Sequence, residues 1–293
     1  MPDIQQHLAS SHKVEFDDLD WGLARQVGLS AREVEMLQYF ADIESQTVFY
    51  MLEVAKLEVA RQPELLAFLT MWNYEEYFHS HAISRLLREC GAETPPPMAR
   101  ATSLRAKARL RARVEDLVQV TLARTMPRAF VALWMTWGAA QELLTTQAYE
   151  DVARSTRNPV LAELFRRIAK QERRHFAYYY VSARERLDGD RAAQRLVRLI
   201  LERNFNPVGS GLKTPAEQAT FLSHIFPGAR LFEAFGEVDD KLEALPGLAG
   251  LRVATAYCHK VQPMLAPEAR YTPPPAPAAG VRAAPGAFAS SRA

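Results

Sequence analysis

Apolar residues recur at intervals of three, four and seven along most of the chain, and the alternation typical of strands is almost absent. This spacing is that of amphipathic helices. Capping residues, prolines and glycines mark where the helices begin and end. The pattern predicts long helices at about Ser30–Arg61, Pro63–Cys90, Ser103–Met126, Pro127–Ser155 and Pro159–Asp188. Shorter helices are expected at about 190–204, 215–226, 229–244 and 249–262.

The same pattern divides the chain into four parts and predicts an all-α fold. An N-terminal extension covers residues 1–29, a bundle of long helices covers 30–190, and a helical appendage packed on the bundle covers 191–265. From Ala266 the chain turns to Pro and Ala with few charges. Such a composition buries too little apolar surface to fold, so residues 266–293 are expected to be a disordered tail.

Four glutamates fall on stripes that the apolar pattern turns toward the core, one near the middle of each of four long helices. They are Glu44, Glu76, Glu142 and Glu172. Burying unpaired carboxylates is prohibitive, and no comparable set of Lys or Arg shares these stripes. Two of the glutamates begin a Glu-x-x-His tetrapeptide, with His79 in "YEEYFHSH" and His175 in "KQERRHFAY". Residues at i and i+3 share a helix face, so each tetrapeptide can offer an oxygen and a nitrogen to one metal ion.

The spacing of these residues indicates an internal duplication. Glu44 and Glu76 are 32 residues apart, Glu142 and Glu172 are 30 apart, and corresponding positions in the two halves are separated by 98 and 96. A Glu helix followed by a Glu-x-x-His helix, twice, is the ligand pattern of ferritin-like di-metal carboxylate bundles. Two divalent cations would balance the four carboxylates. We therefore predict two iron ions, with manganese as the alternative at one or both sites, and Glu76 and Glu172 as the bridging ligands.

The motifs around these ligands resemble those of the soluble acyl-carrier-protein desaturases. "EEYFHSHA" and "KQERRHFAYY" are similar to that family's EExxH and DExRH helices, and "QELLTTQAY" is similar to its QExxT helix. The resemblance covers roughly residues 30–190 and includes all six ligand positions. It implies a di-iron fold, oxygen activation, an acyl chain on a carrier protein and a ferredoxin-type electron donor. It also implies that Thr145 lies beside the oxygen site as a catalytic residue, and that the protein is a homodimer.

One position departs from the pattern of that family. The Asp that precedes the second Glu-x-x-His in the family is Gln171 here, which affects the usual bond to a ligand histidine and the electron route through it. Metal-bound histidines usually donate their other ring nitrogen to an oriented acceptor. From the pseudo-symmetry of the repeat, we predict that Gln171 lies near His79 and that Glu75 lies near His175.

Composition narrows the partners and the compartment. The 293 residues carry 36 Lys and Arg against 34 Asp and Glu, and this net charge of +2, without a binding motif, predicts no nucleic-acid partner. The basic run at residues 100–113 is expected to seat an acidic carrier protein by charge steering. Two cysteines, no signal peptide and no apolar stretch long enough to span a bilayer predict a cytoplasmic protein without a transmembrane segment.

The sequence therefore favours an oxygen-dependent di-iron oxidoreductase with an apolar substrate, closest to an acyl-carrier-protein desaturase. One alternative is a di-iron N-oxygenase or other oxidase of the same fold. Such enzymes often add a histidine one turn before the second Glu-x-x-His, where this chain has Ile168. The non-enzyme alternative is a metal-binding or iron-storing bundle, which the length of the chain disfavours.

Overall fold

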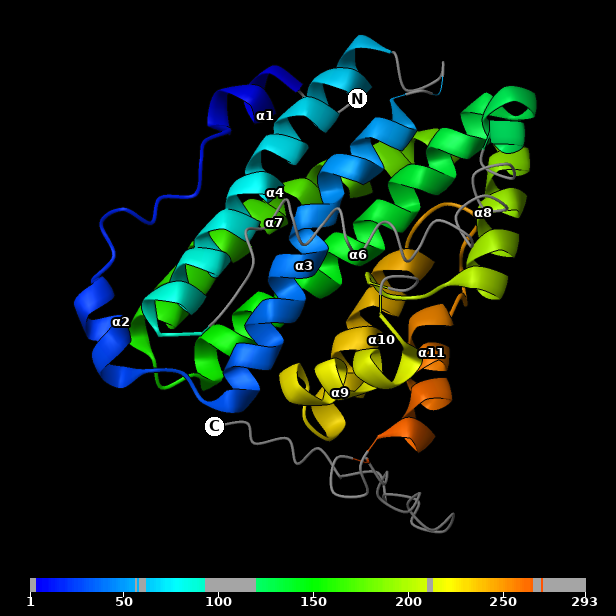
Figure 1. Ribbon diagram of the computed structural model, residues 1–293. Coiled ribbons are helices and arrows are strands. Elements are labelled where there is room, and N and C mark those ends of the chain that lie inside the picture. The colour runs from blue at the N-terminus through cyan, green and yellow to red at the C-terminus, as the bar shows by residue number, and fades with distance from the viewer. Residues whose placement is uncertain are drawn as a thin grey trace, which may run out of the picture.

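Four long helices lie side by side and form the body of the molecule in the computed structural model (Figure 1). They are α3 (Ala31–Val54), α4 (Pro63–Glu89), α6 (Pro127–Ser155) and α7 (Pro159–Leu187). The structure describes residues 4–55, 57, 62–92, 120–209, 213–265 and 270. Every regular element in these ranges is helical, so the predicted all-α class is confirmed.

Local signals place the ends of the long helices close to where the sequence predicts them. The Ser30 hydroxyl accepts from the Glu33 N–H at 3.3 Å while the Glu33 carboxylate accepts from the Ser30 N–H at 2.8 Å, which is the expected capping box. Prolines occupy the first turn of α4, α6 and α7, where a missing N–H costs nothing. Asn158 caps α7, because its side chain accepts from the backbone N–H groups of Val160 and Leu161 in the first turn.

The first long helix ends earlier than predicted. It stops at Val54, not near Arg61, and the chain turns so that the Leu57 N–H donates to the Val54 carbonyl at 2.9 Å. A helix reaching Arg61 would leave one residue to connect it to α4, which begins at Pro63. The two helices pack antiparallel (Figure 1), and such connections take about two to eight residues. The helix therefore ends at Val54, because the connection to α4 requires several residues that are not helical.

Shorter helices cover the body from two sides. At the N-terminal side, α1 (Ile4–Ser10) packs on α4, and α2 (Trp21–Val27) packs on both α4 and α7. At the other side, α8 packs on α6, α9 on α3, and α10 on α6 and α11. Their bounds are α8 Arg191–Asn204, α9 Pro215–Ile225, α10 Ala229–Glu243 and α11 Val253–Val261, followed by the 3₁₀ turn η2 at Gln262–Met264.

Three predicted features fall partly or wholly outside the described residues. The helix expected at 103–126 is described only from residue 120, and 120–125 are helical. The basic run at 100–113 and the tail at 266–293, apart from residue 270, lie outside. The last short helix begins at Val253 instead of 249, because the chain first turns through Gly250, whose φ of +76° does not continue a helix.

Buried side chains join the helices into a continuous apolar core. Three of the four long helices contribute large, fully buried aromatic residues, namely Phe68, Tyr149, Phe165, Tyr178 and Tyr179. Their packing fixes the distances between the helices on which the glutamates lie. None of the helices in the described ranges is long and apolar enough to cross a membrane.

Candidate metal centre

The six side chains singled out in the sequence meet inside the body of four long helices. They are Glu44 from α3, Glu76 and His79 from α4, Glu142 from α6, and Glu172 and His175 from α7. All are buried, the most exposed being Glu142 at 7%. Their ligand atoms form two sets of four, each within 4.8 Å, and Glu76 and Glu172 belong to both sets. Each set could hold a metal ion.

In the first set, His79 turns one ring nitrogen toward three carboxylates. Its Nδ1 lies 3.1 Å from Glu172 Oε1, 3.8 Å from Glu76 Oε2 and 3.9 Å from Glu44 Oε2. Although His79 Nδ1 and Glu172 Oε1 are close, neither has a hydrogen-bond partner of acceptable geometry. Buried polar atoms without partners are costly and rare. A cation between these atoms would satisfy both.

The second set repeats this arrangement around His175. Its Nδ1 lies 3.1 Å from Glu76 Oε1, 3.1 Å from Glu172 Oε2 and 3.6 Å from Glu142 Oε2. Across the described ranges, the two histidines are the only cationic partners in ion pairs with the four glutamates. Imidazole nitrogen with carboxylate oxygen is a donor set suited to divalent transition-metal ions. The residues present therefore fit a dinuclear metal site.

Glu44 and Glu142, which each belong to one set only, resist ionisation when no metal is bound. Burial raises the pKa of Glu44 well above its usual 4.5, and the charge of Glu76 raises it further. Burial raises the pKa of Glu142 in the same way, with the charge of Glu172 as the next contribution. A carboxyl group in such surroundings retains a proton unless a cation replaces it.

The histidines compensate the shared carboxylates. Burial alone would lower the pKa of His79 and His175, but the nearby carboxylates outweigh it and raise both values well above 6.5. Burial would raise the pKa of Glu172, but the two adjacent histidines lower it far below 4.5. In the absence of metal, protons thus supply the positive charge that the cluster requires.

The predicted partners behind both histidines are confirmed. His79 Nε2 lies 2.7 Å from Gln171 Oε1, and His175 Nε2 lies 2.7 Å from Glu75 Oε2. Both oxygens are acceptors, so each Nε2 carries a proton. The neutral ring then has its lone pair on Nδ1, the atom that faces the carboxylates. This tautomer is the one required of a metal ligand.

Glu75 differs from Gln171 in charge. Burial raises the pKa of Glu75, but the hydrogen bond from His175 and the charges of His175 and Arg174 lower it to about 2. Arg174 donates to Glu75 Oε1 at 2.8 Å. Glu75 is therefore an ionised carboxylate bound by the His175 and Arg174 side chains, whereas Gln171 offers a neutral carbonyl oxygen.

Two buried aromatic residues donate hydrogen bonds to Glu44 and Glu142, the glutamates that belong to one set only. Trp72 Nε1 donates to Glu142 Oε1 at 3.0 Å, and the Tyr149 hydroxyl donates to Glu44 Oε1. In each glutamate the other oxygen, Oε2, faces a histidine. The register of α4 could have predicted the contact of Trp72, because Trp72 lies one turn before Glu76 and therefore shares its helix face.

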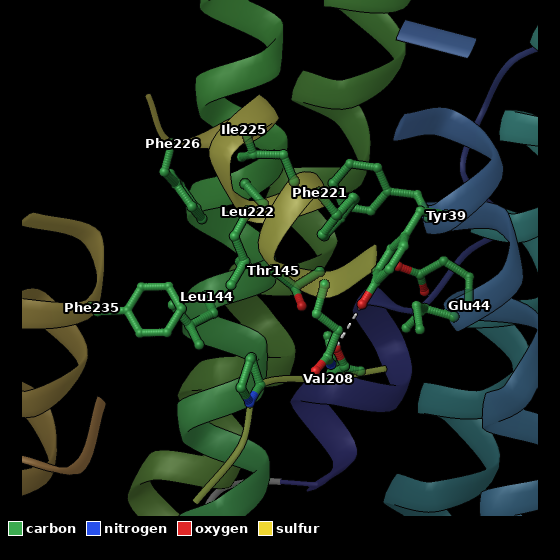
Figure 2. A pocket seen from close by; sticks show the side chains of 15 residues that line it. Tyr39, Glu44, Leu144, Thr145, Val208, Phe221, Leu222, Ile225, Phe226 and Phe235 are labelled. Carbon is green, nitrogen blue, oxygen red and sulfur yellow. Dashed lines mark hydrogen bonds between the residues drawn. The ribbon is translucent and has the colours of Figure 1, made fainter. Parts of the chain in front are cut away.

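Thr145 lies in the wall of an apolar cavity that reaches the cluster (Figure 2). The cavity measures about 30 Å³, which is room for about two water molecules at 10–15 Å³ each. It lies between α3, α6 and the helices α9 and α10, and Glu44 forms part of its wall. Tyr39 stacks on Phe221 at a centroid distance of 3.6 Å and thereby joins α9 to α3 at the edge of the cavity.

Comparisons with protein-family models, with curated proteins and with solved structures give no match to this chain. The fold and the site define an all-helical protein with a buried carboxylate and histidine cluster that could hold metal.

Proposed function

We propose that the cluster binds two iron ions, with manganese as the alternative at one or both positions. We further propose that the protein is an oxygen-dependent oxidoreductase of the ferritin-like di-metal class. The observation that carries this proposal is the pair of overlapping ligand sets that share Glu76 and Glu172. Two adjacent metal ions require shared carboxylates, because the negative charge of each bridging group then neutralises part of the charge of both ions.

Each side chain has a distinct role in this proposal. Glu76 and Glu172 would be shared by the two ions, while Glu44 and Glu142 would each hold one ion with Oε2 available, because an aromatic donor occupies Oε1. Bound iron would supply the capacity to activate oxygen and oxidise a C–H bond. The surrounding protein keeps water away, since the least buried of these carboxylates is 7% exposed.

The apolar cavity favours an apolar substrate. Its wall is aromatic and aliphatic apart from Glu44, Thr145 and Gln218. Such a wall suits an acyl chain better than a charged group, because a charge would lose its hydration without gaining a partner. At about 30 Å³ the cavity admits such a chain only if side chains such as Phe221 move. The Thr145 hydroxyl is the polar group that would hold a reacting oxygen species near the cluster.

The resemblance to acyl-carrier-protein desaturases adds a carrier-bound acyl substrate, an acidic carrier protein, a ferredoxin-type electron donor and a homodimer to this proposal. Ile168 is fully buried on α7, one turn before Glu172. A further histidine of the N-oxygenase type is therefore missing from that position, which favours the desaturase over the N-oxygenase.

The reaction is tested with the iron-loaded protein, reduced ferredoxin, oxygen and a panel of acyl carriers, free fatty acids and arylamines. We expect a double bond in a carrier-bound acyl chain. Thr145→Val should slow this reaction, whereas Thr136→Val should not, because the Thr136 hydroxyl is bonded within α6 to the Ala132 carbonyl. Oxidised arylamines with unchanged acyl chains would favour the N-oxygenase. Bound iron without oxygen consumption would favour a metal-binding protein.

A further inference from the structure

The backbone of one residue connects the partners of both histidines. The His12 N–H donates to Glu75 Oε1 at 3.1 Å, and the His12 carbonyl accepts from Gln171 Nε2 at 2.8 Å. The other carboxylate oxygen of Glu75, Oε2, is bonded to His175, and the amide oxygen of Gln171 is bonded to His79. A continuous chain of hydrogen bonds thus runs from one histidine to the other through the peptide groups of His12.

The backbone N–H and C=O of His12 explain why the two halves of the repeat have different residues, Glu75 and Gln171, at corresponding positions. A peptide N–H can only donate and a carbonyl oxygen can only accept. The group facing the His12 N–H must therefore accept, and Glu75 does so as a carboxylate. The group facing the His12 carbonyl must donate while it also accepts from His79. An amide does both and an ionised carboxylate does not, so Gln171 is the residue that this position requires.

Residues 11–20, here called the N-terminal segment, are attached to both helices that carry a Glu-x-x-His. Arg85 on α4 donates to Asp17 at 2.8 Å. Arg167 on α7 donates to Asp18 at 2.6 and 3.0 Å and to the Glu15 carbonyl at 2.9 Å. Figure 1 shows the segment between α1 and α2, along the outer side of α4.

Burial fixes the segment as well. Val14 is 1% and Phe16 is 5% exposed, so the segment inserts apolar side chains between its polar attachments. Beyond the segment, the Asn158 amide donates to the carbonyls of Ala24 and Gly28 and holds α2 against the start of α7. Glu75 and Gln171 are buried with the segment in place, so detaching it would remove the fixed donor and acceptor that His12 supplies to them.

We propose that the N-terminal segment is a positioning element of the metal centre, in which the His12 peptide orients Glu75 and Gln171 and through them both histidines. This inference rests on the proposed metal centre. Binding of metal and ordering of the segment are then coupled, and coupling between two sites is reciprocal. Bound metal must lower the equilibrium population of the open segment, and loosening the segment must weaken the binding of metal.

The first measurement is amide hydrogen exchange of the full chain over residues 11–20, with and without Mn(II), whose uptake is followed by electron paramagnetic resonance. We expect Mn(II) to slow exchange in this segment by about fivefold or more, the lower end of usual coupling. In the metal-free protein, Gln171→Leu should speed exchange at residues 11–13. Gln147→Leu is the control, since Gln147 is also buried and donates to a backbone carbonyl, that of Ala234.

The second measurement is the affinity for Mn(II) after the segment is loosened from α7. Arg167→Ala removes the attachment to Asp18 and Glu15, and we expect affinity to fall by about fivefold. Arg166→Ala removes a neighbouring arginine on α7 that is bonded to Glu163, and affinity should stay at the wild-type value.

Two results would overturn the inference, and only one of them would also overturn the proposed function. If Mn(II) binds but exchange of residues 11–20 is unchanged and Arg167→Ala binds like Arg166→Ala, the segment does not position the centre, and the proposed metal centre stands. If the wild-type chain takes up neither Mn(II) nor Fe(II), the proposed function fails and the inference fails with it. The exchange measurement on the wild-type chain needs no variant, so it remains decisive even if Gln171→Leu does not fold.

Discussion

Gly138 on α6 is the point of closest approach between α6 and the Tyr179 ring on α7. A Cβ at this position would overlap three carbon atoms of that ring. Tyr179 has little freedom to move, since it is 1% exposed and its ring packs edge-on against Phe68 at 4.8 Å and Trp72 at 6.4 Å between centroids. Gly138→Ala therefore places a methyl group where the core has no space.

Two opposing effects determine the size of the change. Alanine in place of glycine in a helix interior stabilises by about 1 kcal/mol. Overpacking a filled core costs about 1–3 kcal/mol, and the rigid ring puts this site at the upper end, at about 3 kcal/mol. The net expectation for Gly138→Ala is a loss of about 2 kcal/mol in the free energy of unfolding of the metal-free protein.

Gly236 on α10 is the matched control. A Cβ there would meet only Thr255 Cγ2, at 4.0 Å, which is ordinary contact. Gly236→Ala should therefore gain about 1 kcal/mol from helix propensity. Chemical denaturation of both variants measures the difference, expected at about 3 kcal/mol. Equal stabilities for the two variants would refute the packing of α6 on α7 described above.

Two further predictions concern a helix end and the cluster. Burial raises the pKa of Glu33, but hydrogen bonds led by that of Thr156 lower it more, so its pKa lies below 4.5. The ionised Glu33 carboxylate therefore stabilises the fold above pH 4.5, and this stabilisation is lost as pH falls through the folded-state pKa. The difference in the free energy of unfolding between wild type and Glu33→Gln should thus persist at neutral pH and shrink in acid. A difference that does not change with pH would contradict this. Trp72→Phe removes the donor to Glu142 Oε1 and should lower Mn(II) affinity about tenfold or more, whereas Trp137→Phe should not; equal affinities would contradict the role of Trp72.

The parts of the structure that the sequence predicts well depend on local or repeated signals. Helix starts follow from Pro63, Pro127 and Asn158, which act on the residues next to them. The contacts of Gln171 and Glu75 with the histidines follow from the internal repeat, because each residue precedes a Glu on one helix and faces the other. Periodicity suffices for both because it determines which face of a helix a residue occupies.

The parts that the sequence did not predict depend on contacts between distant segments. His12 lies in a non-periodic stretch, and its role comes from peptide groups that every residue except proline has. Trp72 and Tyr149 look like any buried aromatic residue until their polar atoms are placed against Glu142 and Glu44. Helix α3 ends at Val54 without a glycine or proline, because the reversal into α4 decides its length.

We propose that four carboxylates and two imidazoles bind two metal ions, and diffraction from iron-loaded crystals at the iron absorption edge tests this directly. We expect two anomalous peaks per chain about 3.5–4 Å apart. One should lie among Glu44, Glu76, His79 and Glu172, and the other among Glu76, Glu142, Glu172 and His175. Crystals of iron-treated protein that show no peak at this position, or bound iron elsewhere in the chain, would contradict it.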